Sequence, residues 1–250
     1  MRNRFTRLLL PILPALACLA LWQIWILLLP DHVFFIGSPS GTLQELISAV
    51  AEGKLFYHMG ITASEALFGF VAGSLIGTLL GLMLWYFPAA YRISSLYIVS
   101  LGSVPVFALG PVLIFWFGTG MTSKVVLGFL STFVVALAQA HTGAKEADVN
   151  LLRLTTAFGG TKWQMLTKII APSSAIWVLA GMRINLGMAL LGAFVGEFIS
   201  SQAGLGHFII TAEGLYNVNQ IWVGVLGITT LAISFHMLTI PIERWAKRWQ

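Results

Sequence analysis

The segment RLTTAFGGTKWQMLTKIIAP, residues 153–172, is the longest polar stretch in a chain that is otherwise strongly apolar. Apolar runs precede and follow it, and the Gly159-Gly160 pair lies near its centre. Because glycine adopts turn conformations that other residues avoid, the pair predicts a tight bend between two short helices, residues 151–158 and 162–170. Two helices joined in this way would form a projecting knuckle that contacts a partner.

Composition indicates that the protein resides in a membrane. The chain has 58% hydrophobic and 9% charged residues and a mean hydropathy of +0.88, far from the composition of a soluble domain. Crossing a bilayer takes about 20 mainly apolar residues. Six stretches qualify: 8–29, 61–85, 93–117, 122–141, 174–196 and 221–240. These runs do not alternate apolar with polar residues as barrel strands do, so we expect one all-α transmembrane domain over residues 1–250 with a cytoplasmic segment at 142–172.

The basic residues predict the orientation of the six spans. With a cytoplasmic N-terminus, the inner side holds most of the Lys and Arg residues, namely Arg2, Arg4, Arg7, Arg92, Lys145, Arg153, Lys162, Lys168, Arg244, Lys247 and Arg248. The outer side holds only Lys54 and Lys124, and Arg183 falls within a span. This asymmetry favours cytoplasmic positions for both termini. The net charge of +5 therefore reflects topology, and we expect no nucleic-acid partner.

The first span could be mistaken for a signal peptide, because three arginines precede its apolar run. The run continues to Leu29, which is too long for a signal peptide, so we expect it to be retained as a span. Cys18 within it is the single cysteine. The chain can therefore form neither an internal disulfide nor a cysteine-based metal cluster.

The connection between the first two spans predicts a short amphipathic helix on the outer face. In GTLQELISAVAEGK, residues 41–54, one helical face would carry Leu43, Leu46, Ile47 and Val50. We predict no folded soluble domain, so a solute would have to be captured by another chain.

Regularly spaced glycines in two spans predict close helix packing. The second span has glycines at every fourth position, Gly69, Gly73, Gly77 and Gly81, and the fifth repeats the spacing at Gly192 and Gly196. Such a ridge lets a neighbouring helix approach closely. A role for the ridge in substrate passage is the alternative.

The third span contains Pro105 and Pro111. Proline removes a backbone donor and should kink the helix, which is tolerated at membrane depth only where protein or a wet cavity satisfies the freed carbonyls. We therefore predict that these two positions line a translocation path.

Three ionisable residues at membrane depth, Glu65, Arg183 and Glu197, are candidate functional residues because burying a charge in lipid is costly. Arg183 and Glu197 are about four turns apart on one face of the fifth span, roughly 21 Å, and so cannot pair. We predict that Arg183 and Asn185 face the path and that Glu197 lies near the outer mouth beside Glu65. The alternative is that Arg183 snorkels or caps carbonyls and that both glutamates are interfacial.

An outer gate is predicted at the end of the fifth span. Glu197 precedes a segment in which Gly204 and Gly206 permit backbone bends that bulkier residues resist. We expect the Glu197 carboxylate to accept hydrogen bonds from this turn, and we expect the turn to move during transport.

The sequence predicts no catalytic, metal or nucleotide site. The histidines share no helical face or ligand spacing, at positions 32, 58, 141, 207 and 236. The loops Gly118-Thr119-Gly120 and Gly204-Leu205-Gly206 lack the lysine and the strand-turn-helix context of a phosphate-binding loop. We expect the chain to hydrolyse nothing and to hold no cofactor.

The knuckle resembles the cytoplasmic coupling motif of binding-protein-dependent ABC importer permeases. That motif reads Glu-Ala-Ala, three residues, Gly, nine residues, Ile, one residue and Leu-Pro, and the chain matches it at Gly159, Ile169 and Pro172. Arg153-Leu154-Thr155 stand where Glu-Ala-Ala is usual, and Ala171 stands where Leu is usual. Four other stretches resemble the nitrate, taurine and aliphatic-sulfonate branch: GSPSGTLQELISA (37–49), VPVFALGPVLIFWFGTG (104–120), AGMRINLGMAL (180–190) and GEFISSQAGLGHFI (196–209). Glu65 departs from this branch, which often has Arg there.

The resemblance implies a type I ABC importer permease in the inner membrane of a bacterium. It implies a homodimer, two cytoplasmic ATPases that carry ATP and Mg²⁺, an external binding protein, and a small, often anionic solute passed by alternating access. The implied ATPase-docking residues are Arg153, Leu154, Thr155, Ala157, Phe158, Gly159, Gly160 and Thr161. The alternative function is an ion-coupled secondary transporter or channel that uses Glu65 and Glu197.

Overall fold

The computed structural model describes residues 13–246, in which the regular elements are all helical. Helices long and apolar enough to cross a membrane are α5 (Lys54–Tyr86), α8 (Met121–Lys145), the run Lys162–Ile199, and Val218–Ile242 within α13 (Val218–Ala246). Two bent helix pairs bring the possible spans to six. The all-α architecture expected from the sequence is confirmed, and residues 8–12 of the first predicted span lie outside the described residues.

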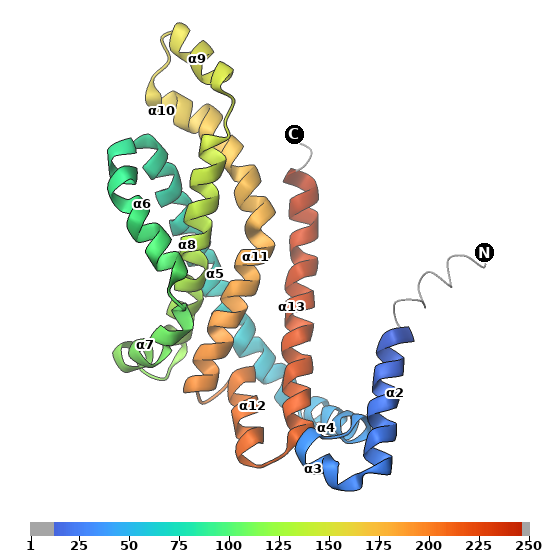
Figure 1. Ribbon diagram of the computed structural model, residues 1–250. Coiled ribbons are helices and arrows are strands. Elements are labelled where there is room, and N and C mark those ends of the chain that lie inside the picture. Colours follow the sequence, from blue (N-terminus) through green and yellow to red (C-terminus); the bar gives the residue numbers. More distant parts are fainter. Residues whose placement is uncertain (1–12, 247–250) are drawn as a thin grey trace, which may run out of the picture.

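The bundle has two distinct ends (Figure 1). The knuckle, α9 (Val149–Ala157) and α10 (Lys162–Met165), lies at the same end as the C-terminal part of α13. At the opposite end lie α3 (Val33–Ile36), α4 (Pro39–Ala51), α7 (Gly110–Phe117) and α12 (Leu205–Gly214). The charge asymmetry makes the knuckle end cytoplasmic and the other end external.

Glycines fix the centre of the bundle, where α5, α8 and α11 (Ala171–Ile199) meet. A Cβ at Gly69 would lie 2.9 Å from the Gly128 backbone on α8, and a Cβ at Gly192 on α11 would lie 2.8 Å from the Gly128 Cα. Gly128 is thus enclosed by a glycine on each side. The ridge continues along α5, where a Cβ at Gly73 or Gly81 would also meet α8 within 3.0 Å. The predicted close packing is therefore present on both helices, and side chains there would force the backbones apart.

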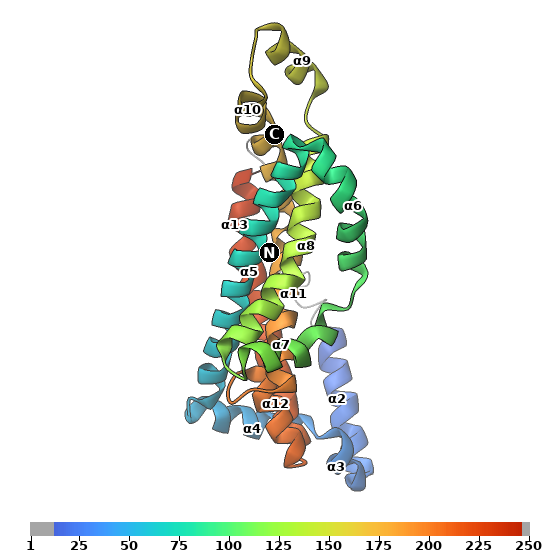
Figure 2. The same cartoon turned by 90° about the vertical axis from the view of Figure 1, so that its left-hand side faces the viewer.

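The third predicted span is two helices rather than one kinked helix. α6 (Pro88–Ser103) and the following pair, η2 (Val106–Leu109) and α7, are bent by 83°. The break falls at Val104-Pro105, because the residue before a proline is disfavoured in the helical conformation. Pro111 lies in the first turn of α7, where a missing N–H costs nothing, so the prediction that it kinks the span is wrong. No residue of α6 is buried in the single chain, and Figure 2 shows this helix at the edge of the bundle.

The first span also bends. α2 (Leu13–Leu28) turns by 115° into η1 (Pro30–His32) and α3, and stands apart from the other long helices (Figure 1). The Trp22 and Trp222 rings, with centroids 5.3 Å apart, join its outer part to α13. The Ser40 backbone N–H donates to Gln23 Oε1 at 3.1 Å and ties α2 to α4.

The short outer helix predicted from the sequence is present as α4, and most of its apolar stripe faces away from the bundle. Thr42 and Ala49 are buried and Leu46 packs against the core, whereas Leu43 and Ile47 are exposed. The predicted helix is present, but Leu46 alone of its apolar stripe lies inward. The exposed leucine and isoleucine are suited to contact lipid or another chain.

Candidate functional site

The knuckle is built by two standard helix caps and one glycine. The Asp148 side chain accepts a hydrogen bond from the Asn150 N–H at 2.7 Å and begins α9. Thr161 and Gln164 form a reciprocal capping box that begins α10. Between the two helices, Gly159 has φ +73°, a left-handed conformation that glycine adopts without strain. The predicted bend at this glycine is therefore present.

The second knuckle helix is not a separate element. α10 passes through a π-helical turn, η3 (Leu166–Ile170), directly into α11, so the predicted helix at 162–170 has no end of its own. Leu166 and Ile170 are buried against Ala144 and Ala147. The continuous helix gives a displacement of α10 a direct route to the membrane part of α11.

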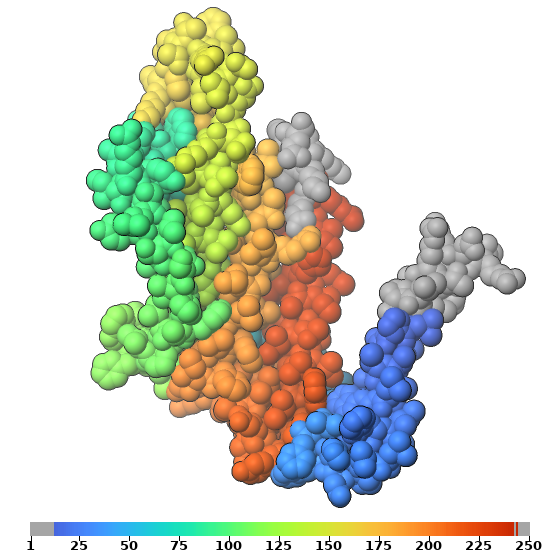
Figure 3. Space-filling view, viewed as in Figure 1, coloured from blue at the N-terminus to red at the C-terminus, as the bar shows by residue number. Residues whose placement is uncertain are grey.

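The knuckle is anchored at α10 and open at α9. Lys162 Nζ donates to the carbonyl oxygen of Tyr86 at the end of α5 and lies 4.8 Å from the centroid of the Tyr86 ring. Trp163 makes an edge contact with the same ring at 6.3 Å. α9, in contrast, stands clear of the bundle (Figure 3). The α10 half of the knuckle thus contacts α5 and continues into α11, while the α9 half points away from the bundle.

α9 and the residue that follows it expose an apolar stripe. Leu151, Leu154 and Phe158, at spacings of three and four residues, form one stripe with exposed fractions of 48%, 53% and 83%. The docking residues implied by the sequence include the last two, and Leu151 is an addition that the same helical spacing could have revealed. Arg153 is also exposed on this helix.

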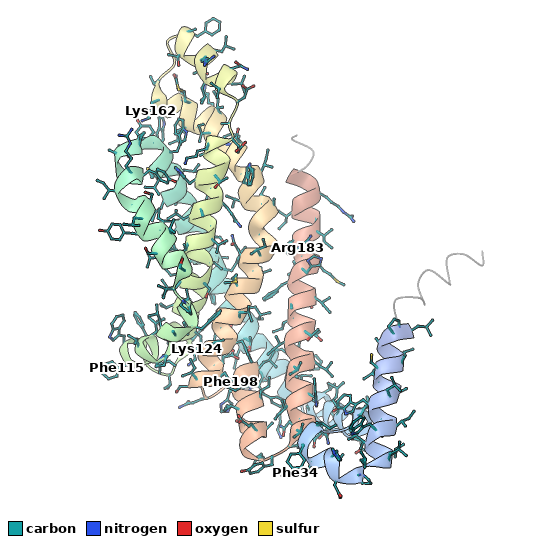
Figure 4. The ribbon with its side chains drawn as sticks, in the orientation of Figure 1. Phe34, Phe115, Lys124, Lys162, Arg183 and Phe198 are labelled. Carbon is teal, nitrogen blue, oxygen red and sulfur yellow. The ribbon has the colours of Figure 1, made fainter. Side chains whose placement is uncertain are left out.

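The predicted path residues lie in different environments. Arg183 is exposed in the single chain, and Figure 4 places it about midway along α11. Asn185 is fully buried against α8, where its Nδ2 donates to Gln139 Oε1 at 3.1 Å. Pro105 is exposed at the break between α6 and α7. Their roles in a path stay predictions.

A polar cluster closes the outer end of the bundle. Glu197 of α11 accepts two hydrogen bonds, from Thr62 Oγ1 to its Oε1 and from the Gly206 N–H to its Oε2, both at 2.7 Å. Thr62 also accepts from the Leu205 N–H at 2.8 Å, and His58 Nδ1 accepts from the Gly204 N–H at 3.0 Å. The predicted contact between Glu197 and the following turn is present. Three successive backbone N–H groups therefore hold this turn in place.

The glycines of this turn are required by close approach. Gly204 has φ +103°, and a Cβ on it would overlap the Glu197 carboxyl group. A Cβ on Gly206 would lie 2.6 Å from the Phe194 carbonyl oxygen and 2.8 Å from the Phe198 N. The turn is thus fixed against α11, and its assignment as a moving gate stays a prediction.

The sequence did not predict that Lys124, or the anchors His58 and Thr62, belong to this cluster. The charge pattern placed Lys124 on the outer side, but its side chain is fully buried where α8 meets α11 (Figure 4). Its Nζ donates to the Thr119 carbonyl oxygen. A Cβ at Gly196 would lie 3.0 Å from Lys124 Cγ, so this glycine makes room for the lysine stem. The spacing of Gly192 and Gly196 was visible in the sequence, but the sequence did not show that Gly196 packs against Lys124.

The fold defines a polytopic helical membrane protein with a helical knuckle that projects beyond the bundle at one end. The chain belongs to the family of binding-protein-dependent transport system inner membrane components, whose model matches residues 69–248. It is therefore an ABC transporter permease of the import family, a multi-pass protein of the bacterial inner membrane.

Individual relatives agree with this family. The chain is 30% identical to the riboflavin transport system permease protein RibX of Chloroflexus aurantiacus, over 93% of this chain and 87% of the relative. It is 27% identical to the putative aliphatic sulfonates transport permease protein SsuC of Bacillus subtilis, over 84% and 75%. A solved chain of the MetNI methionine ABC transporter has the same fold, with a TM-score of 0.64 at 18% identity, over 77% of this chain and 94% of that chain.

Proposed function

We propose that two copies of this chain enclose a path through which a small anionic solute enters the cell. Two cytoplasmic ATPases dock on the knuckles and supply the energy from ATP and Mg²⁺, and an external binding protein delivers the solute. The family membership supports the partners, since permeases of this family work with an ATPase and a substrate-binding protein.

The observation that carries the docking assignment is the apolar stripe on α9. Leu151, Leu154 and Phe158 are exposed at the end of the molecule that projects beyond the bundle. Large apolar side chains grouped on a projecting surface mark a protein contact rather than a solvated face. Arg153 beside them would pair with an acidic residue of the partner.

The structure offers a direct mechanical route from this contact to the membrane. α10 continues into α11, and Lys162 holds the end of α5 through Tyr86. Closure of the two ATPases would therefore tilt α5 and α11 together with the knuckle, and would open the path alternately to each side.

The anionic character of the solute rests on Arg183. This arginine lies in the membrane part of α11 and would give a path between two copies a positive potential. The likeness to SsuC supports an anion such as a sulfonate, whereas the name of RibX shows that related permeases carry different solutes.

The competing function, an ion-coupled carrier, needs carboxylates that meet water in turn from each side. Glu65 and Glu197 have exposed fractions of 3% and 0%. Both Glu197 oxygens also accept hydrogen bonds from the protein, one from Thr62 and one from the Gly206 N–H. These contacts favour a structural role for Glu197 over ion coupling.

The test is solute uptake into proteoliposomes that contain the permease, its ATPase and its binding protein. ATP enclosed in the lumen of the proteoliposomes should drive solute uptake without any ion gradient. Gly159→Val should abolish uptake while the permease still inserts, because valine at φ +73° costs about 1–2 kcal/mol and reshapes the knuckle. Gly53→Val is the matched control, since Gly53 has φ +71°, equal free space and a position at the outer end. Uptake driven by an ion gradient alone, or equal uptake by both variants, would refute the proposal.

A further inference from the structure

Three ionisable side chains meet in the outer cluster without access to water. Lys124 and Glu197 have exposed fractions of 0% and Glu65 of 3%, and they come from α8, α11 and α5. The other titratable groups near this cluster are His58 on α5 and His207 on α12, whose rings lie 6.1 Å apart. A buried charge must be compensated by an opposite charge or by a proton, so the charges of these three residues constrain one another.

Glu197 has the hydrogen-bond pattern of an ionised carboxylate. Both of its oxygens accept, one from Thr62 Oγ1 and the other from the Gly206 N–H. The single hydrogen of the Thr62 hydroxyl could go to Glu197 Oε1 at 2.7 Å or to the His58 carbonyl oxygen at 3.2 Å, and the shorter distance assigns it to Glu197. The Gly206 N–H can only donate, so neither oxygen of Glu197 carries a proton in this arrangement.

Glu65 has the pattern of a carboxyl group that carries a proton. Its carboxyl group is close enough to that of Glu197 to form a hydrogen bond, and two carboxyl groups can do so only if one of them is protonated. The Glu65 Oε2 atom has no hydrogen-bond partner in the protein. A carboxylate left with an unpartnered buried oxygen would be far costlier than a neutral acid.

Lys124 supplies the opposite charge. It acts on both glutamates at a distance, since its Nζ donates to the Thr119 carbonyl oxygen instead of pairing directly with either carboxyl group. One ammonium group, one carboxylate and one neutral acid leave the buried cluster without net charge.

We propose that Glu65, Lys124 and Glu197 form a charge-neutral lock that holds the turn at residues 204–206 closed against α5. Glu197 is the ionised member and binds the turn. Glu65 keeps its proton and donates a hydrogen bond to Glu197, and Lys124 is a positioning residue that stabilises the Glu197 carboxylate. The lock does not bind solute or a coupling ion. It is a property of this chain, independent of the solute and of the docking partner.

The experiment reads the closed position of the turn through Leu205, which is fully buried. A Leu205→Cys variant in a Cys18→Ala background is treated from outside with a membrane-impermeant maleimide, with the full transporter complex in proteoliposomes. Leu215→Cys, at a residue that is 69% exposed at the same end, calibrates the labelling rate. Lys124→Met should raise the labelling rate of Cys at 205 at least tenfold, because the Glu197 charge loses its compensation. Lys54→Met is the control, since Lys54 is exposed and pairs with Glu52, and its labelling rate should equal that of the parent.

Second substitutions assign the charge to one glutamate. Glu65→Gln alone should stay within about twofold of the parent, because an amide still donates to Glu197 and leaves the net charge unchanged. Adding Glu197→Gln to Lys124→Met should reverse part of the increase in labelling, since the cluster becomes neutral again although glutamine replaces only one of the two acceptor oxygens. Adding Glu65→Gln to Lys124→Met should not, because the Glu197 charge persists.

The proposal is overturned if Lys124→Met labels like the parent, or if both glutamine substitutions rescue it equally. It is also overturned if Glu65→Gln alone labels as fast as Lys124→Met. Should Lys124→Met not assemble, the two single glutamine variants decide: Glu65→Gln must match the parent in labelling rate and melting temperature, and Glu197→Gln must not, because it has one acceptor oxygen for two donors.

Discussion

Replacing Gly204 by alanine should open the outer end of the permease. Gly204 has φ +103° and ψ 169°, a region that only glycine occupies readily, and an alanine there costs about 1–3 kcal/mol of backbone strain. The added Cβ would also overlap the Glu197 carboxyl group, approaching Oε2 to 2.6 Å. Relief of that overlap in a tightly packed site costs roughly another 1–3 kcal/mol. We expect a total of about 2–6 kcal/mol against the closed turn.

Gly118 provides a control that separates the two contributions. It has φ +77° and ψ −180°, nearly the same backbone conformation, but a Cβ on it would meet no atom within 4 Å. Gly118→Ala should therefore show only the backbone strain of about 1–3 kcal/mol. The assay is the melting temperature of each purified variant complex, together with its ATP-driven uptake at matched expression. Gly204→Ala should melt clearly below Gly118→Ala and lose more uptake. Equal melting temperatures and equal uptake would show that the Glu197 contact contributes nothing to the closed turn.

Three further substitutions test the core, the path and the outer cluster. Gly192→Ala should lower the melting temperature, because its Cβ would lie 2.8 Å from the Gly128 Cα. Gly187→Ala on the same helix should leave the melting temperature unchanged, because its Cβ would meet nothing within 4 Å. Equal melting temperatures of the two variants would contradict the packing argument. Arg183→Gln should abolish uptake of an anion while the complex still elutes as one peak in size-exclusion chromatography, and undiminished uptake would leave only a structural role. Glu197→Gln should transport less than the parent but more than Glu197→Ala, because glutamine keeps one of the two accepted hydrogen bonds. If Glu197→Ala transported more than Glu197→Gln in an uptake assay, hydrogen bonding to the turn would not be the role of Glu197.

Local patterns in the sequence were sufficient to predict the helices and the knuckle. The four-residue spacing from Gly69 to Gly81 describes one helical face, so close packing followed directly from it. The Gly159-Gly160 pair predicted the bend for an equally local reason, and Glu197 lies close enough in sequence to Gly206 that their contact could be expected. In each case the residues that carry the pattern are close together in the sequence, so the prediction needed no knowledge of the tertiary structure.

The missed features depend on contacts between distant parts of the chain. Lys124 follows a glycine-containing loop, a position typical of a surface lysine. Its burial is explained only by the packing of Gly196 against it. The anchors of the turn, His58 and Thr62, are 146 and 143 residues away in sequence from the groups that they bind. The sequence likewise did not show which residues of α4 face the bundle, because α4 packs on α13, which is distant in the sequence, and buries Thr42 and Ala49. Proline chemistry indicated a break in the third span, but only the structure shows that Pro105 makes it and Pro111 begins the next helix.

The central claim, that the knuckle is the site at which an ATPase drives this permease, is tested most directly by cross-linking. In a Cys18→Ala background, single cysteines replace Phe158, directly after α9, and Phe115 on α7, which are 83% and 87% exposed. Helices α9 and α7 lie at opposite ends of the molecule (Figure 1). A short thiol-reactive photo-cross-linker is attached to each in the assembled transporter, and the product is identified by its mass. We predict that the cysteine at position 158 cross-links to the ATPase, with a yield that changes when ATP is bound, and that the cysteine at position 115 does not. An ATPase adduct at position 115, or none at position 158 in a complex that still hydrolyses ATP, would contradict the account.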